Sequence, residues 1–245
     1  MINFKMKRVN LLFVTVLIFM LHLPFAFSRS NEFPKSTLPA VSSARSNSAI
    51  LVLYDSLHLE LKGLSESAFT NAVKGFEYLK AKGKISNENV LSIVDFTKSS
   101  SQKRLFVIDL ANKKVLFNTY VAHGQNSGQE YANRFSNKPE SFESSLGFYV
   151  TEDTYVGKNG YSLHLSGLEN GINDRADERA IVMHGAPYVS ENFIRSKGYL
   201  GRSWGCPAVP ENLNRPIIEK IKNGSCLFIY SQNKKYLNYS KILNS

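Results

Sequence analysis

The sequence after residue 100 most constrains the fold, because it consists of short segments with the composition of β-strands. Branched and aromatic residues dominate segments 104–110 and 114–124, and clusters of Gly, Asn and Ser separate the segments of this kind. Residues 111–113 between these two are typical of a hairpin loop. Further strand candidates are 147–151, 161–165, 180–184 and 226–230. The pattern predicts a mainly β domain over residues 101–232, a sandwich or a distorted barrel.

Residues 50–100 form a different region, which we predict to be helical and which makes the whole chain α+β. Ser65 is a typical helix N-cap, and Gly83 is expected to end the helix that follows it. The apolar residues between them are spaced by three and four, as in one helix face: Phe69, Ala72, Val73, Phe76 and Leu79. A second, shorter helix is expected to begin near Asn87. Nothing in this region indicates chemistry, so we expect it to serve packing.

The first residues of the chain predict export. Three basic side chains within positions 5–8 precede an apolar run over residues 11–23, and residues 26–28 offer the small side chains of a cleavage site. The run of about 13 residues is shorter than the roughly 20 that cross a bilayer. We therefore expect residues 1–28 to be a signal peptide, with no stable membrane span after cleavage. The expected location is the periplasm or the cell envelope.

Charge and composition narrow the partners. Without the three basic residues of the signal peptide, the formal net charge of +10 falls to +7. This charge either suits an anionic envelope polymer or membrane surface or serves solubility alone. The Lys and Arg residues are scattered and form no patch with interleaved aromatics, which argues against nucleic acid. Residues 29–49 are rich in Ser, Asn and Pro and are expected to be a linker. Residues 233–245 are expected to be a peripheral polar tail, and the sequence leaves the oligomeric state open.

The candidate chemistry lies between His184 and Cys206. His184 follows the apolar run 180–183 and precedes Gly185, and Cys206 comes 22 residues later, after a loop. A thiol with an ordinary pKa of about 8.5 needs help to ionise, and a nearby imidazole can take its proton. The combination therefore indicates a cysteine nucleophile with a histidine base.

Other residues near this pair are candidates for supporting roles. Gly205 permits a tight turn whose backbone N–H groups can stabilise an oxyanion, and Ser203 adds a hydroxyl donor. His123 also ends a predicted strand before a glycine, so it either lines the same cleft or competes as the base. Tyr188 lies in the loop before the cysteine, where it either covers the substrate or pins the loop to the β core.

Cys226 leaves another role open for Cys206. Cysteines of exported proteins are usually paired, and a Cys206–Cys226 disulfide would stabilise the fold by roughly 3 kcal/mol. The protein would then be a non-catalytic secreted binding module. Against this, Cys226 begins the apolar run CLFIY and has the pattern of a buried strand residue. No spacing resembles a zinc site, so the sequence predicts neither a metal nor another cofactor.

Four stretches of the chain resemble a known family. They are VMHGA, GRSWGCPA, VIDLANKKVLFNTYVAHG and SSLGFYVT, within a similarity that covers about 130 of the 245 residues. They resemble the YkuD-like L,D-transpeptidases, which cross-link peptidoglycan, and are closest to a divergent branch of murein L,D-transpeptidase catalytic domain proteins. The family pattern of a histidine with a small residue, then Ser/Thr-His-Gly-Cys, is matched at His184, Gly185, Ser203, Gly205 and Cys206.

The resemblance implies a fold, a reaction and a partner. The fold is an L,D-transpeptidase-like sandwich or distorted barrel, and the partner is the stem peptide of peptidoglycan. Cys206 would attack the carbonyl of the third stem residue, His184 would be the base, and the carbonyl of Gly185 would orient the imidazole. An amine of a second stem would then give a 3-3 cross-link. Water in its place would make the protein an L,D-carboxypeptidase.

Two departures from the family pattern concern the substrate. Trp204 stands where the family commonly has histidine, and residues 207–208 replace a hydrophobic residue and an Arg or Asn. Arg202 either supplies the missing positive charge from the other side of the cysteine or is a solvated loop residue. A protein that keeps the fold and binds peptidoglycan without turnover is a further possibility.

Overall fold

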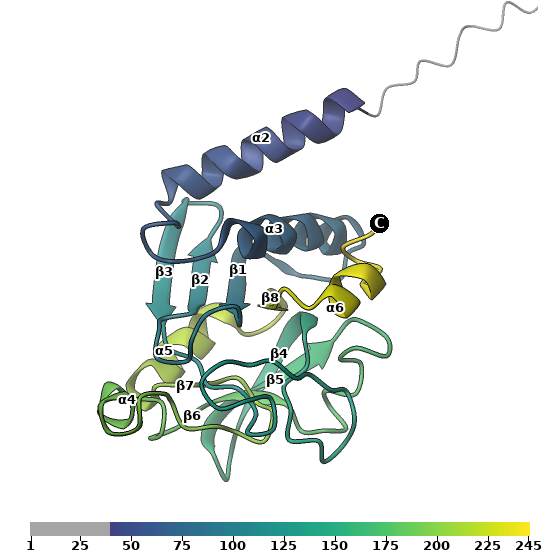
Figure 1. The fold of residues 1–245 in the computed structure, drawn as a ribbon. Coiled ribbons are helices and arrows are strands. Elements are labelled where there is room, and N and C mark those ends of the chain that lie inside the picture. Colours follow the sequence, from purple (N-terminus) through teal and green to yellow (C-terminus); the bar gives the residue numbers. More distant parts are fainter. Residues whose placement is uncertain (1–39) are drawn as a thin grey trace, which may run out of the picture. The chain divides into compact units, whose positions relative to one another are not determined.

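The computed structural model describes residues 40–245, which form one eight-stranded mixed sheet with a few helices (Figure 1). Across the sheet the order is β3-β2-β1-β8-β4-β5-β6-β7. The strands are β1 (Asn87–Asp95), β2 (Leu105–Asp109), β3 (Lys114–Thr119), β4 (Gly147–Gly157), β5 (Gly160–Gly167), β6 (Val182–Gly185), β7 (Ala208–Val209) and β8 (Ser225–Tyr230). The predicted mainly β, α+β class is confirmed. The predicted signal peptide and the first part of the predicted linker lie outside the described residues.

The two ends of this sheet meet through the segment that follows β3. The N–H of Ala122 donates to the carbonyl of Ala208 in β7 at 2.8 Å. Gly124 forms a parallel bridge with Ser203, just before β7. Because the last strand is joined to the continuation of the first edge, the sheet is nearly closed and barrel-like. The closing segment also carries His123 to the loop that holds the cysteine.

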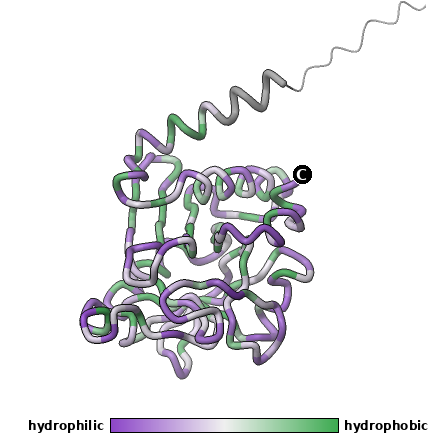
Figure 2. The backbone as a smooth tube through the Cα atoms, in the orientation of Figure 1, coloured by the Kyte–Doolittle hydropathy of each residue, from purple (hydrophilic) through white to green (hydrophobic). Residues whose placement is uncertain are grey.

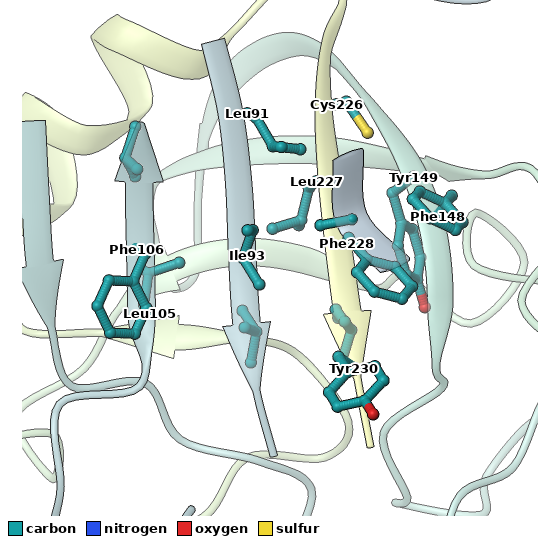
Figure 3. Packing of buried hydrophobic residues seen from close by; sticks show 14 of the residues in the cluster. Leu91, Ile93, Leu105, Phe106, Phe148, Tyr149, Cys226, Leu227, Phe228 and Tyr230 are labelled. Atoms are coloured by element: carbon teal, nitrogen blue, oxygen red, sulfur yellow. The ribbon is translucent and has the colours of Figure 1, made fainter. Parts of the chain in front are cut away.

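The core lies along the central strands, where hydrophobic residues gather while the loops are more hydrophilic (Figure 2). Leu91 and Ile93 of β1 and Leu227 and Phe228 of β8 are completely buried (Figure 3). The rings of Phe148 and Phe228 stack with centroids 4.1 Å apart. Each such side chain stabilises the fold by about 1.5–3 kcal/mol relative to exposure. A core of this size supports the domain without a disulfide.

Five helices flank the strands within the described residues. They are α2 (Ala40–Ser56), α3 (Glu66–Ala81), α4 (Glu191–Lys197), α5 (Glu211–Ile221) and α6 (Lys234–Tyr239). The expected cap of α3 is confirmed, because the Ser65 hydroxyl accepts from the N–H of Ala68 at 3.3 Å. Its five predicted apolar positions are all buried. Between residues 40 and 245, no helix combines the length and the apolar character needed to cross a membrane.

Two predictions for the N-terminal half are wrong. Residues from Asn87 form β1 instead of a helix, and this strand lies between β2 and β8 in the middle of the sheet. Residues 90–95 are buried, because such a strand is covered on both faces, so its apolar run lacks the alternation that marks a half-exposed strand. The sheet therefore begins at residue 87, before the expected boundary at 100. Residues 40–49, expected in the linker, belong to α2.

The C-terminal residues are also more integrated than predicted. Tyr236, Ile242 and Leu243 are at most 5% exposed and pack against the core. The buried carboxylate of Glu169 accepts hydrogen bonds from the hydroxyls of Tyr236, at 3.0 Å, and of Ser240. The expected peripheral tail is thus anchored by three apolar side chains and a shared carboxylate.

Candidate active site

Strand pairing brings the candidate base and nucleophile to one place. His184 and Gly185 of β6 pair in parallel with Ala208 and Val209 of β7. Cys206 lies two residues before Ala208, and its sulfur accepts a hydrogen bond from the N–H of Val182 at 3.5 Å. Val182 likewise lies two residues before His184, the register partner of Ala208. The thiol and the imidazole therefore come from adjacent segments of the chain.

The imidazole of His184 is oriented by its own strand. Its Nδ1 lies 2.9 Å from the carbonyl oxygen of Gly185. Because a carbonyl only accepts, Nδ1 carries the proton, and Nε2 presents a lone pair. The side chain is almost buried, and burial lowers the pKa of the imidazole, an effect that the hydrogen bond to Gly185 partly offsets. The ring is therefore neutral at pH 7 and able to accept a proton.

The thiol of Cys206 is free, partly exposed and protonated. Its Sγ donates to the carbonyl of Ala180 at 3.6 Å. Within residues 40–245, this carbonyl and the N–H of Val182 are its hydrogen-bond partners, and His184 is not among them. Burial raises the pKa of the thiol, whereas the N–H of Val182, the charge of Arg179 and its own N–H act in the opposite direction. The thiol of Cys206 and the imidazole of His184 are thus both neutral in this structure.

The turn before the cysteine is fixed internally. The Ser203 hydroxyl accepts from the N–H of Gly205 at 3.1 Å and donates to the carbonyl of Cys206 at 2.6 Å. Gly205 has φ +125°, and a Cβ there would lie 2.9 Å from the carbonyl oxygen of Glu143, so only glycine suits this position. The expected hydroxyl of Ser203 is thus already engaged within the turn. The N–H of Cys206 itself acts to lower the pKa of the Cys206 thiol.

His123 is occupied on both ring nitrogens. Its Nδ1 accepts from Nη2 of the fully buried Arg104 at 2.7 Å, and its Nε2 lies 3.1 Å from the carbonyl of Gly128. Burial and the nearby Arg104 charge lower its pKa to about 3. The ring is therefore a structural group rather than a competing base. Its backbone carbonyl accepts from the N–H of Ser203 at 3.0 Å. This hydrogen bond supports the turn formed by residues 203–206.

Tyr188, Arg202 and Trp204 surround the cysteine turn. Burial, and to a lesser degree the charge of an ionised Cys206, raises the pKa of Tyr188 to about 12. Tyr188 and Arg202 line one surface pocket of about 400 Å³. Arg202 reaches the carbonyl of Gly128 at 3.4 Å. Trp204 is 70% exposed beside the ring of Phe142, with centroids 5.6 Å apart.

Arg179 is a neighbour of the thiol that the sequence did not reveal. Its guanidinium donates to the carbonyls of Glu143 at 2.6 Å and Ser136 at 2.7 Å. Its Nη2 lies 3.2 Å from the position of a Cβ built on Gly205, and its charge lowers the pKa of the Cys206 thiol. The only sequence signal was a basic residue just before the apolar run at 180–183, which is too common to single out.

The remaining candidates carry no second centre. Cys226 is buried in β8 among core side chains (Figure 3), and burial strongly raises its pKa. Both cysteines are free, so this structure does not support the disulfide alternative. In the part of the chain that the structure describes, no three His, Cys, Asp or Glu side chains are grouped to hold a metal.

Comparisons with known proteins place this arrangement in context. A family model described as L,D-transpeptidase catalytic domain matches residues 60–230. No curated protein matches the sequence significantly.

Three solved structures illustrate the similarity in fold. An L,D-transpeptidase from Mycobacterium smegmatis is 14% identical with a TM-score of 0.36, over 58% of this chain and 59% of that one. An L,D-transpeptidase from Stackebrandtia nassauensis is 13% identical with a TM-score of 0.36, over 68% of each chain. The helical cell shape determining protein Pgp2 from Campylobacter jejuni is 13% identical with a TM-score of 0.41, over 70% of this chain and 61% of that one. This chain thus spans about three fifths of the M. smegmatis and C. jejuni chains.

Proposed function

Because this chain belongs to the L,D-transpeptidase catalytic domain family, we propose that it is a peptidoglycan-modifying cysteine acyltransferase with Cys206 as nucleophile and His184 as base. The observation that carries the proposal is the imidazole of His184. Its Nδ1 is held by the carbonyl of Gly185, so Nε2 faces no competing proton of its own. The free thiol lies on the paired chain, two residues from the partner of His184.

The first half-reaction is acylation by a stem peptide. The thiol leaves the carbonyl of Ala180, and His184 Nε2 takes its proton while Sγ attacks the carbonyl of the third stem residue. The N–H of Cys206 stabilises the resulting oxyanion. When the C–N bond breaks, His184 returns the proton to the departing amine of D-alanine. The product is a thioester between Cys206 and the tripeptide stem.

The second half-reaction determines the product. An amine of another stem attacks the thioester with His184 again as base, which gives a 3-3 cross-link and restores the thiol. Water in place of the amine gives an L,D-carboxypeptidase. The exposed Trp204 and the pocket lined by Tyr188 and Arg202 offer the contacts through which an acceptor peptide is held on either side of the cysteine.

The resting contact between Cys206 and Ala180 is compatible with this chemistry. A cysteine side chain changes rotamer within nanoseconds when partly exposed. Hydrogen bonds of catalytic groups are often long or misdirected before substrate binds. Rotation of Sγ away from Ala180 and toward His184 is therefore the step that we assign to substrate binding.

The location follows from the substrate. We propose that residues 1–28 direct export and that the protein acts in the periplasm or cell envelope, where peptidoglycan lies. The net charge of +7 that remains after residue 28 favours association with an anionic polymer.

The test is turnover of purified disaccharide-tetrapeptide by the exported form, followed by mass spectrometry, beside Cys206→Ala. Cysteine-dependent loss of D-alanine supports the proposal, with dimers identifying a transpeptidase and tripeptide alone a carboxypeptidase. Cys226→Ala is the matched control and should retain activity. No turnover by a folded protein whose Cys206 thiol titrates as free would overturn the proposal in favour of a non-catalytic binding protein.

A further inference from the structure

A tight turn before β6 brings the carbonyl of Ala180 to 3.6 Å from the sulfur of Cys206. The N–H of Ala180 donates to the carbonyl of Asp177 at 2.8 Å, and that of Ile181 donates to Ala176 at 2.9 Å. Ala180 has φ +51°, a left-handed conformation that costs a non-glycine residue about 1 kcal/mol or more. The turn directs the Ala180 carbonyl at the thiol of Cys206, and the preceding residue is Arg179.

The guanidinium of Arg179 is held in a fixed position beside the nucleophile turn. Nη1 donates to the carbonyl of Ser136 and the hydroxyl of Ser145, and Nη2 donates to the carbonyl of Glu143 and the hydroxyl of Ser141. Nη2 also lies 3.2 Å from the position that a Cβ on Gly205 would occupy. The charge of Arg179 therefore lies next to Gly205, the residue that immediately precedes Cys206.

No carboxylate in the described region hydrogen-bonds to Arg179. All four of its acceptors are uncharged oxygens, and among residues 40–245 it takes part in no ion pair. The carboxylate of Glu143 acts on Arg179 through its charge, but its ion-pair partner is Arg134, whose Nε lies 3.5 Å away. A half-buried guanidinium with neutral partners keeps its field available for an anion that forms nearby.

The other titratable groups around the thiol do not supply this charge. His184 on β6 and Tyr188 in the following loop are neutral at pH 7. Arg202 is directed at the carbonyl of Gly128 and the ring of Tyr199. Burial raises the pKa of Cys206, and Arg179 is the one charged side chain in the described region that acts against this.

We infer that Arg179 is a positioning residue that stabilises the Cys206 thiolate electrostatically, while the adjacent carbonyl of Ala180 holds the thiol in its resting, protonated place. The inference rests on the proposed function, in which Cys206 is the nucleophile. Loss of the proton removes the hydrogen bond to Ala180 and turns that carbonyl dipole repulsive. The same event strengthens the attraction to Arg179. The turn thus contributes two groups. The carbonyl of Ala180 binds the protonated thiol, and the charge of Arg179 stabilises the thiolate after the proton is lost.

The test is the pH dependence of alkylation of Cys206 by iodoacetamide in the folded, exported protein. The thiolate displaces iodide, a C–S bond replaces the C–I bond, and the thiol proton passes to the buffer. Arg179→Gln should slow alkylation at pH 7 roughly tenfold and raise the midpoint of the profile by about one pH unit. Arg179→Lys, which keeps the charge, should restore most of this shift.

Arg175→Gln is the matched control, because it removes the same charge from the same turn region. Arg175 is exposed and pairs with Glu178 at 3.0 Å. The rate of Cys206 alkylation in the Arg175→Gln variant should therefore match that of the wild type within twofold across the pH range. A second pair of variants neutralises Arg179 without removing it. Ser141→Asp sets a carboxylate against Nη2 and should raise the midpoint, whereas the uncharged Ser141→Asn should not.

Equal midpoints for Ser141→Asp, Ser141→Asn and the wild type would overturn the inference, even if Arg179→Gln does not fold. An unchanged midpoint in folded Arg179→Gln would do the same. Alkylation needs no peptidoglycan, so it separates the two proposals. A wild type that fails on the tetrapeptide while showing the Arg179-dependent shift refutes the proposed function and leaves this inference standing.

Discussion

The pairs His123-Gly124 and His184-Gly185 are alike in sequence and opposite in environment. Both histidines are nearly buried, at 1% and 6% exposure, and burial lowers the pKa of both. His123 has a partner on each nitrogen, whereas His184 has one on Nδ1 alone. Within residues 40–245, the two histidines therefore differ in one ring nitrogen, which has no hydrogen-bond partner in His184. Neither burial nor the motif separates them.

The two histidines also differ in how they relate to the turn at residues 203–206. The carbonyl of His123 accepts from Ser203, and Ser203 in turn holds the carbonyl of Cys206. His123 therefore supports the geometry of the turn at residues 203–206 through a backbone hydrogen bond. In the proposed mechanism His184, on the neighbouring strand, accepts the proton of the thiol. Substitution of each histidine should consequently disturb a different property.

The largest expected effect is on turnover. His184→Ala should lower kcat/KM for D-alanine release from the stem tetrapeptide by roughly 10²–10⁴-fold, because the thiol loses its proton acceptor. His123→Gln should lower it by less than about tenfold, since no proton transfer involves this ring. Steady-state kinetics on both variants measure the difference. Equal losses in two folded variants would contradict the division of roles.

The next effect concerns folding and has the opposite pattern. His123→Ala should cost about 3 kcal/mol of unfolding free energy, because the buried Arg104 and the carbonyl of Gly128 lose their partner. His184→Ala should cost less, since its ring leaves only one carbonyl unpaired. Urea denaturation at pH 7 gives both values. A His184 variant less stable than the His123 variant would reverse the assignment.

The smallest expected effect is a pH linkage that identifies His123. Below pH 6.5 the unfolded chain protonates this histidine while the folded protein, with a pKa of about 3, does not. Stability contributed by His123 is therefore lost as the pH falls, at about 1.4 kcal/mol per pH unit. The stability advantage of the wild type over His123→Gln should shrink by about 2 kcal/mol between pH 7 and pH 5. Parallel curves for the two proteins would refute the low pKa.

Local pattern was sufficient for some of this molecule. The cap at Ser65 and the hairpin around residues 111–113 depend on neighbours within a few positions, and both are confirmed. β1 was mistaken for a helix because a strand buried on both faces has no alternating pattern. The apolar runs of β6 and β8 were sufficient to predict two strands. Local pattern does not reveal which strands pair, so their partners were not predicted.

The site was predictable only as a set of residue types. The sequence offered two His-Gly pairs and two cysteines, and local features could not rank them. The ring of His123 is occupied by Arg104, 19 residues earlier, and the thiol is influenced by Arg179, 27 residues before it. Such contacts arise from strand register and turn geometry, which a single sequence does not display.

The position of β8 has a consequence for how the chain reaches this structure. The strand that fills the middle of the sheet is the last one made, and it pairs in parallel with β1, which precedes it by more than a hundred residues. Forming such a pairing requires the closure of a very long loop, and the loss of chain entropy precedes any stabilising contact. Folding is therefore expected to be slow. A growing chain can form the β2–β3 hairpin early, yet its core stays open until synthesis passes residue 230. Because Ser203 and Ala208 pair with the segment that closes the sheet, we expect the turn at residues 203–206 to become ordered late in folding.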